Sequence, residues 1–256
     1  MSDLGQHELE LLTSAEVDIE GRMPWSSNAT FRVSLLVDGV EQGKAIYKPL
    51  AGERPLWDFE PGLHRREFAA FRLSEAMGLQ LVPPTVLRDG PLGEGSLQWY
   101  VDADHEQHYF TLYESRPDLH ARLRDFAMFD IVANNTDRKS GHVLIDASES
   151  LWGIDHGLCF AEDFKLRTVV WEFGGESLAE HWIEPLQRVA QRPPADVAEL
   201  LQALREWRAV FADKRHFKWG SHTLKPEFAE QERALEQKIG QLRTTLHRTC
   251  LQRVRQ

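Results

Sequence analysis

The sequence predicts an α+β fold in which a small antiparallel sheet is followed by a mainly helical part. Apolar and polar residues alternate in two early segments, residues 31–37 and 43–48, as in half-buried strands. Apolar residues recur at helical spacing in residues 117–133, and most of the chain after residue 176 has a helical pattern. The 256 residues suffice for one bilobal domain or two small ones.

The two early segments, FRVSLLV and GKAIYK, are expected to form a hairpin. The link between them contains Asp38-Gly39, a dipeptide typical of tight hairpin turns. Residues 64–77 follow with apolar side chains near one face of a helix, and Gly78 is a common helix stop.

The sheet is expected to continue after this helix. Residues 79–87 (LQLVPPTVL) are predicted to be extended, because a residue that precedes proline avoids the α region. Residues 96–101 (SLQWYV) are predicted to form one more strand. We therefore expect an N-lobe over residues 1–101, an exposed linker over 102–115 and a C-lobe over 116–256.

The second part begins with a strongly apolar helix over residues 117–133, whose first turn accommodates Pro117. A polar loop follows, and then two short apolar runs, HVLI and LWGI, separated by a turn at residues 146–150. Further helices are predicted over residues 176–191, 194–212 and 226–254. The last of these is basic and amphipathic, and we interpret it as a helix that packs on the C-lobe rather than on a membrane.

Charge and composition exclude several classes of function. The formal net charge of -10 argues against a nucleic-acid partner and against an anionic membrane surface. The 2 cysteines, Cys159 and Cys250, are far apart and have no metal-like spacing, so we expect a cytoplasmic protein. The first ten residues, MSDLGQHELE, do not resemble a secretory signal. No apolar run approaches the ~20 residues that span a bilayer, so no transmembrane segment is expected.

Two aspartates enclose the predicted hairpin of the second part. Asp137 lies in the polar loop before it, and Asp155 follows its second strand, so both carboxylates are expected at the same edge. Two nearby carboxylates repel each other unless a cation lies between them or one is protonated. Mg²⁺ prefers few protein carboxylates together with phosphate oxygens and water. Phosphoryl transfer requires such a metal carboxylate and a second carboxylate that positions the acceptor.

The residues that surround these aspartates resemble the catalytic and metal-binding loops of phosphoinositide 3/4-kinase-like and HipA-like atypical kinases. The resemblance rests on Asn-Thr-Asp-Arg-Lys-Ser-Gly-His at residues 135–142 and on Ile-Asp-His-Gly at residues 154–157. Those families have an Asp-Arg-His-x-x-Asn loop, a short hairpin and an Asp-x-Gly. The resemblance implies a bilobal protein-kinase-like fold, a role for Asp137 at the acceptor hydroxyl and a role for Asp155 as a metal ligand.

Upstream residues fit the same resemblance in the same order. Lys48 ends the second predicted strand, where these kinases keep a phosphate-binding lysine, and Glu67 lies on the next helix, where the glutamate that pairs with it is found. Ser26, Ser27 and Asn28 resemble a phosphate loop, although no glycine follows Gly21 in it. Val101 and Asp102 would contact adenine through main-chain groups.

This sequence departs from the family pattern at two positions. His142 stands where the families have a second metal ligand, asparagine, and Lys139 stands where they have histidine. Imidazole is a poorer Mg²⁺ ligand than an amide oxygen, which leaves room for Mn²⁺ or for a structural role of His142. Asn135, counted with Asp137 and Lys48 among the candidate catalytic residues, is expected to brace the loop by side-chain hydrogen bonds. Asp130 either anchors this loop or lies on a solvated face.

The resulting prediction is an ATP- and Mg²⁺- or Mn²⁺-dependent phosphotransferase that acts on a hydroxyl of unknown identity, on a protein, a lipid or a small molecule. Two alternatives stay open. One is a nucleotide-binding pseudokinase that acts as a regulatory module, which the missing glycines, Lys139 and His142 favour. The other is an enzyme with the same pocket that transfers AMP.

Overall fold

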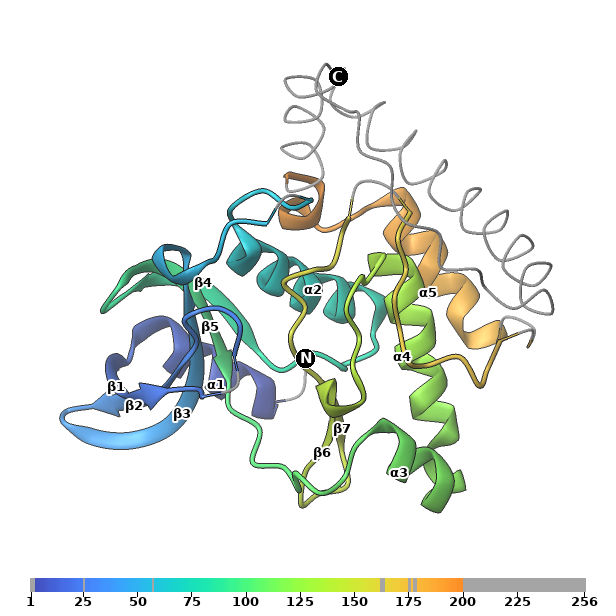
Figure 1. The fold of residues 1–256 in the computed structure, drawn as a ribbon, viewed down its shortest axis with the longest axis horizontal. Coiled ribbons are helices and arrows are strands. Elements are labelled where there is room, and N and C mark those ends of the chain that lie inside the picture. Colours follow the sequence, from blue (N-terminus) through green and yellow to red (C-terminus); the bar gives the residue numbers. More distant parts are fainter. Residues whose placement is uncertain are drawn as a thin grey trace.

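A computed structural model describes residues 3–24, 26–56, 58–161, 164–174, 176 and 179–199 of the chain. In Figure 1 the antiparallel sheet lies to one side, and helices with a small hairpin lie to the other. The predicted α+β order, with the sheet first and helices later, is confirmed. Residues 200–212 and 226–254 of the expected later helices lie outside the described residues.

The sheet has five antiparallel strands in the order β1-β2-β3-β5-β4. Its strands are β1 Glu16–Arg22, β2 Phe31–Val37, β3 Val40–Pro49, β4 Thr85–Gly90 and β5 Gly93–Trp99. The predicted hairpin is β2–β3, and both turn residues, Asp38 and Gly39, have positive φ angles of 51° and 76°. The strand expected at residues 96–101 is observed at Gly93–Trp99 as β5.

The sequence analysis missed the first helix, α1 (Asp3–Ser14), and β1. Leu11 and Leu12 of α1 pack with Val33, Tyr47 and other apolar residues on one face of the sheet. Side chains alternate between the faces of a strand, so Lys48 lies on the face opposite to Tyr47. That second face is covered by α2 (Leu63–Met77).

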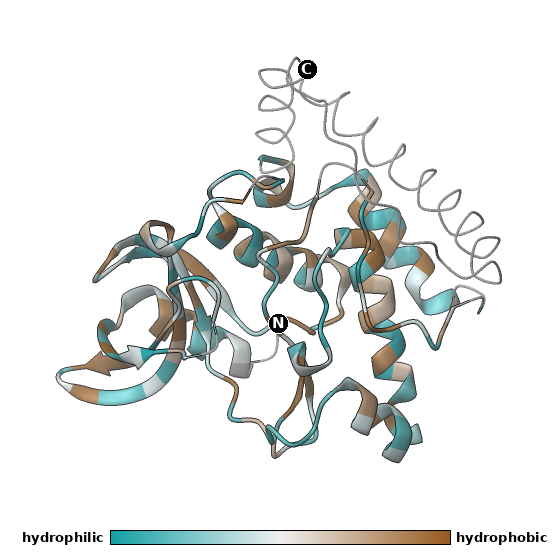
Figure 2. Ribbon diagram, viewed as in Figure 1, coloured by the Kyte–Doolittle hydropathy of each residue, from teal (hydrophilic) through white to brown (hydrophobic). Residues whose placement is uncertain are grey.

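The predicted helix at residues 64–77 is confirmed as α2. It ends at Gly78, whose φ of 70° is left-handed and whose N–H bonds to the last turn. Hydrophobic and hydrophilic residues alternate along α2 in Figure 2, as expected for a helix with one face in a core. Within the described residues, no helix is both long enough and apolar enough to cross a membrane.

The second part centres on α4 (His120–Ala133), which follows a short turn of helix at Pro117–Leu119. Leu123, Phe126 and Phe129 of α4 are fully buried. The predicted hairpin is confirmed as β6 (Val143–Ile145) and β7 (Leu151–Gly153), and α5 (Glu180–Gln191) completes the named elements. The segment predicted as a linker is only partly a connection, because its second half forms α3 (Tyr109–Ser115) with Tyr109 and Leu112 buried.

Candidate active site

Lys48, Glu67 and Asp155 meet between the sheet and the hairpin of the second part. Lys48 Nζ donates to Glu67 Oε1 and, at 2.9 Å, to Asp155 Oδ1. The three residues come from β3, α2 and the segment after β7. The lysine side chain is 22% exposed and that of Glu67 is 2% exposed, whereas that of Asp155 is 48% exposed. The group is thus buried at Glu67 and accessible to solvent at Asp155.

Electrostatics keep Lys48 and Asp155 ionised. Burial by itself would lower the pKa of Lys48, but the carboxylates of Asp155 and Glu67 more than offset burial and raise that pKa above its ordinary value. The ammonium of Lys48 in turn holds the pKa of Asp155 well below its usual range, against the effect of burial. At neutral pH the site therefore presents a cation beside an anion with accessible surface.

The backbone of Asp155 is in a rare conformation. Its φ is 60°, a left-handed value that costs most L-residues about 1 kcal/mol or more and that aspartate tolerates better than most. Such outliers concentrate at functional sites. The next residue anchors this turn, because the His156 N–H donates to Glu67 Oε2 at 2.9 Å. Glu67 therefore binds both the lysine and the aspartate segment.

Asp130, in the last turn of α4, binds side chains of the loop that precedes the hairpin and contains Asp137. Asn135 donates from Nδ2 to Asp130 Oδ1 at 2.8 Å, and its Oδ1 accepts the Asp137 N–H at 3.1 Å. Both ends of the Asn135 amide are thus occupied by the protein, as expected for a bracing residue. Asp130 is completely buried, so the alternative of a solvated face is wrong.

Arg138 is the site residue that the sequence analysis did not single out. Its buried guanidinium contacts Asp130 at 2.8 Å, His156 Nε2 at 2.8 Å and the Ile154 carbonyl at 3.2 Å. Arg138 therefore joins the Asp137 loop to the segment that carries Asp155. The only sequence signal was its position directly after Asp137, because its partners lie eight to eighteen residues away.

Asp137 is partly exposed and paired with a neighbour. Its Oδ2 lies 2.8 Å from Lys139 Nζ, and the lysine side chain is 59% exposed. An exposed pair of this kind contributes about 0–1 kcal/mol, so Lys139 can leave Asp137 at little cost. The carboxylate is thus available to another donor, although the pair partly neutralises it.

His142, in the loop between Asp137 and β6, lies next to Asp155. Its Nε2 lies 3.5 Å from Asp155 Oδ2, and its Nδ1 accepts the Lys139 N–H at 3.4 Å. Burial lowers the pKa of His142, which favours the neutral ring. If Nδ1 accepts, the ring proton is on Nε2 and faces Asp155, so this geometry suits a hydrogen-bond donor better than a metal ligand.

The donor set limits how a metal could be bound. Within the described residues, no group of three or more His, Cys, Asp or Glu side chains is arranged to hold an ion. In this pair Asp155 offers one carboxylate ligand, because the ring proton of His142 faces it. This fits Mg²⁺, which takes one or two carboxylates and completes its shell with phosphate oxygens and water.

The candidate phosphate loop connects β1 and β2. Ser26 Oγ bonds to Thr30 Oγ1 at 2.8 Å, and Asn28 Oδ1 accepts the Arg54 N–H at 2.9 Å. The Ala29 N–H also donates to the Gly52 carbonyl at 2.9 Å. The loop is thereby attached to the segment that directly follows β3 and Lys48.

Val101 and Asp102 lie in the connection after β5. The Tyr100 N–H donates to the Lys44 carbonyl at 3.0 Å, and the Asp104 N–H donates to the Ile145 carbonyl at 3.1 Å. The connection is therefore fixed to the sheet at one end and to β6 at the other. The backbone of Val101 has no hydrogen bond within the described part of the chain.

Comparisons with known proteins place the chain in a family. No family model matches it. It is 34% identical over 231 residues to Protein Rv2133c of Mycobacterium tuberculosis (strain ATCC 25618 / H37Rv), in an alignment that covers 77% of this chain and 83% of the relative. The chain therefore belongs to the same family as Protein Rv2133c.

Solved structures define the fold. The Golgi casein kinase matches with a TM-score of 0.51 and 15% identity over 98% of this chain and 76% of that one. Hydra Fam20 with sugar (TM-score 0.46, 13% identity, 98% and 90% coverage) is also similar. So is the Helicobacter pylori proinflammatory kinase CtkA (TM-score 0.45, 10% identity, 93% and 96% coverage). The match to the Golgi casein kinase shows that this chain has a kinase-like fold.

Proposed function

We propose that this family member is an ATP- and divalent-metal-dependent phosphotransferase that acts on a hydroxyl acceptor. The observation that carries the proposal is the contact of Lys48 with both Glu67 and Asp155 on an atypical-kinase-like fold. A lysine held by a buried glutamate and placed beside an accessible aspartate is the arrangement that phosphoryl transfer uses to bind triphosphate and metal.

In this proposal the sheet and the helical part are two lobes that enclose ATP. Lys48 binds phosphate oxygens, and the loop with Ser26, Ser27 and Asn28 covers them. The backbone of Val101 and Asp102 contacts adenine, for which the unbonded main chain of Val101 is suited. This is the bilobal arrangement implied by the resemblance to phosphoinositide 3/4-kinase-like and HipA-like proteins.

Asp137 is proposed to orient the acceptor hydroxyl and to receive its proton. The bond between the γ-phosphorus and the bridging oxygen of ADP breaks while the bond from the acceptor oxygen to phosphorus forms. Asp155 would hold Mg²⁺ or Mn²⁺, which would neutralise the phosphate charge. The hydrogen bonds from Asp130 through Asn135 keep the backbone of Asp137 in place.

The test measures ATP consumption and ADP formation with Mg²⁺ and with Mn²⁺. Wild type is compared with Asp137→Ala, Asp155→Ala and Asp89→Ala, the last being an exposed carboxylate on β4 that serves as the matched control. We expect a loss of at least about a hundredfold in the first two variants, as for residues that act at the transition state. Equal turnover in all four proteins would refute the proposal.

A second candidate is a nucleotide-binding module without transfer activity, in which Lys139 stays paired with Asp137. If the pair blocks Asp137, the protein binds ATP and is stabilised by it but forms no ADP. Lys139→Ala would then increase turnover from a negligible level. Mass spectrometry of the products separates phosphate transfer from the remaining alternative, AMP transfer, by the mass that the acceptor gains.

A further inference from the structure

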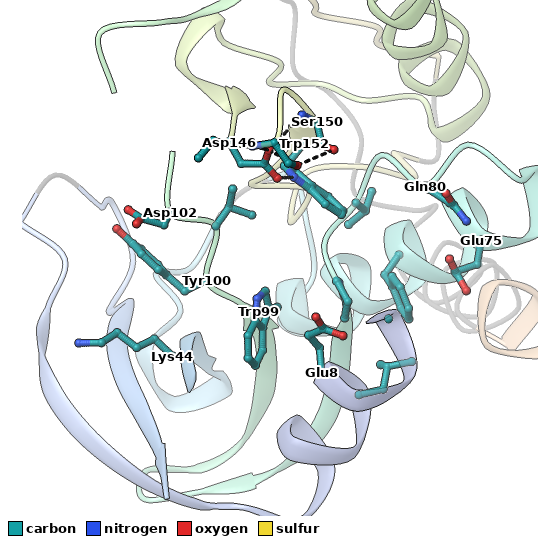
Figure 3. A pocket seen from close by; sticks show the side chains of 18 of the residues that line it. Glu8, Lys44, Glu75, Gln80, Trp99, Tyr100, Asp102, Asp146, Ser150 and Trp152 are labelled. Carbon is teal, nitrogen blue, oxygen red and sulfur yellow. Dashed lines mark hydrogen bonds between the residues drawn. The ribbon is translucent and has the colours of Figure 1, made fainter. Parts of the chain in front are cut away.

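A cavity lies beside the connection between the sheet and the helical part, and its lining shares Val101 and Asp102 with the proposed adenine contact. Its volume is about 950 Å³, which is within the usual size of small-molecule sites. It is bounded by α1, by the C-terminal half of α2, by residues 99–102 and by the turn of the β6–β7 hairpin (Figure 3). Its described lining includes neither Lys48 nor Asp155.

The lining combines aromatic rings with carboxylates. Phe71, Trp99, Tyr100 and Trp152 supply the rings, and Glu8, Glu75, Asp102 and Asp146 supply the acids. In Figure 3 the side chains of Glu8 and Trp152 point into the cavity from opposite walls. Aromatic faces attract cations, most strongly when the ring is tryptophan, and carboxylates add to the attraction.

The basic residues of the lining do not cancel these acids. Arg32 and Lys44 both bind the carboxylate of Glu20, which lies outside the described lining. Asp146 is also satisfied internally, since it accepts from Ser148, Ser150 and Trp152. The groups that remain available to a ligand are therefore mainly Glu8, Glu75 and Asp102.

Glu8 is the decisive residue. Its Oε2 is buried and has no hydrogen-bond partner among the described residues. A buried carboxylate oxygen without a donor is costly, and an ammonium group would supply both the charge and the N–H donors. The aromatic walls would at the same time cover an apolar body attached to that group.

We propose that this cavity binds a small organic cation that consists of an ammonium group and an aromatic or aliphatic body. The ammonium binds Glu8, and the apolar body lies between Trp99 and Trp152. The site goes beyond the proposed phosphotransferase activity. It shares Val101 and Asp102 with the proposed adenine contact, but none of the three groups of the Lys48 trio lines it.

The test is calorimetric titration of the full-length chain with 2-phenylethylammonium and with 2-phenylethanol, its neutral analogue of similar shape. No nucleotide is present, so the result is independent of phosphate transfer. We expect the ammonium to bind at least about tenfold more tightly than the alcohol, the ratio expected from one charge-assisted hydrogen bond. Equal affinities, or no binding of either compound at millimolar concentration, would overturn the proposal.

Two variants assign the preference to Glu8. Glu8→Gln keeps the shape and should reduce the ammonium affinity about tenfold, while the alcohol affinity stays unchanged. Glu10→Gln, on the exposed side of the same helix, is the control and should bind as wild type does. If Glu8→Gln binds the ammonium as tightly as wild type, the assignment is wrong. Competition between the ammonium and a non-hydrolysable ATP analogue would show instead that this cavity is the nucleotide site.

Discussion

Removing the carboxylate charge of Asp130 should destabilise the protein far more than removing a surface charge does. Both Asp130 and Arg138 have side chains with 0% exposure and lie 2.8 Å apart. Asp130 also accepts from Asn135 and Thr168, each at 2.8 Å. Asp130→Asn keeps the volume but leaves the guanidinium of Arg138 buried without a counter-charge.

Breaking a buried pair in this way costs about 3–5 kcal/mol, out of a total unfolding free energy of about 5–15 kcal/mol. For a chain of this size each kcal/mol lowers Tm by about 2–4 °C, so we expect a decrease of about 6–20 °C. The assays are thermal and urea unfolding at pH 7. The control is Asp118→Asn, which breaks the exposed pair of Asp118 with Arg116 and should leave Tm nearly unchanged.

A double variant tests the mechanism of the loss. In Asp130→Asn combined with Arg138→Met the unpaired cation is gone, so the two costs should not add, and the coupling should be about 0.5–3 kcal/mol. Two results would contradict the proposed role of the buried pair in holding the Asp137 loop. One is an equal Tm for Asp130→Asn and Asp118→Asn. The other is additivity of the costs of Asp130→Asn and Arg138→Met.

Three further outcomes follow from described contacts. Arg88 Nη1 donates to the carbonyls of Leu12, Thr13 and Ala15 at 3.0–3.1 Å, so Arg88→Ala should reduce the free energy of unfolding by about 1.5–3 kcal/mol. Amide hydrogen exchange should become faster in α1 than in α2, and unchanged exchange in α1 would contradict this. A Cβ on Gly95 would lie 2.6 Å from the Lys48 carbonyl, so Gly95→Ala should cost about 1–3 kcal/mol, whereas Gly21→Ala, with no atom within 4 Å, should be nearly neutral in the same urea assay. The side chains of Lys44 and Ser34 lower the pKa of Glu20 from 4.5 to about 2, so its stabilising effect is complete above pH 4.5 and is lost as the pH falls towards 2. Glu20→Gln should therefore destabilise the protein at pH 7 and less at pH 3, and a constant difference between the two pH values would be the contrary result.

The elements that the sequence predicted are those with strong local signals. The β2–β3 hairpin has Asp38-Gly39 at its turn, α2 has Gly78 at its end, and the β6–β7 hairpin joins two short apolar runs. In each case residues that are close in sequence determine the conformation. Local sequence patterns were therefore enough to predict these three elements.

The first helix and strand were missed because their signals are weak and their stability comes from distant residues. Among the α1 side chains that the structure describes, the buried ones that pack on the sheet are Leu11 and Leu12, with Ala15 just beyond the end of the helix. Strand β1 has no fully buried residue, and it is held by pairing with β2. Tertiary packing supplies what propensity does not.

At the candidate site, the sequence predicted which residues take part but not which of them are in contact. Lys48, Glu67 and Asp155 could be chosen as candidates by motif, but their contact spans 19 and 107 residues of sequence. Arg138 matches the arginine of the family loop, but its structural role could not be predicted, because that role depends on Asp130 and His156 being folded around it. A buried ion pair is visible only when both partners are located in space.

Gly157 shows how a short motif can encode a long-range contact. It is the glycine of Ile-Asp-His-Gly, and its φ lies outside the left-handed region, so conformational freedom does not explain its presence. A Cβ at this position would lie 3.3 Å from Glu67 Oε1 and 3.5 Å from Leu63 Cβ, both on α2. The absence of a side chain lets the Asp155 segment approach α2 closely enough for the His156 N–H to reach Glu67 at 2.9 Å. A side chain at this position would press on the carboxylate of Glu67, so Gly157 favours the close approach that brings Glu67, Lys48 and Asp155 together.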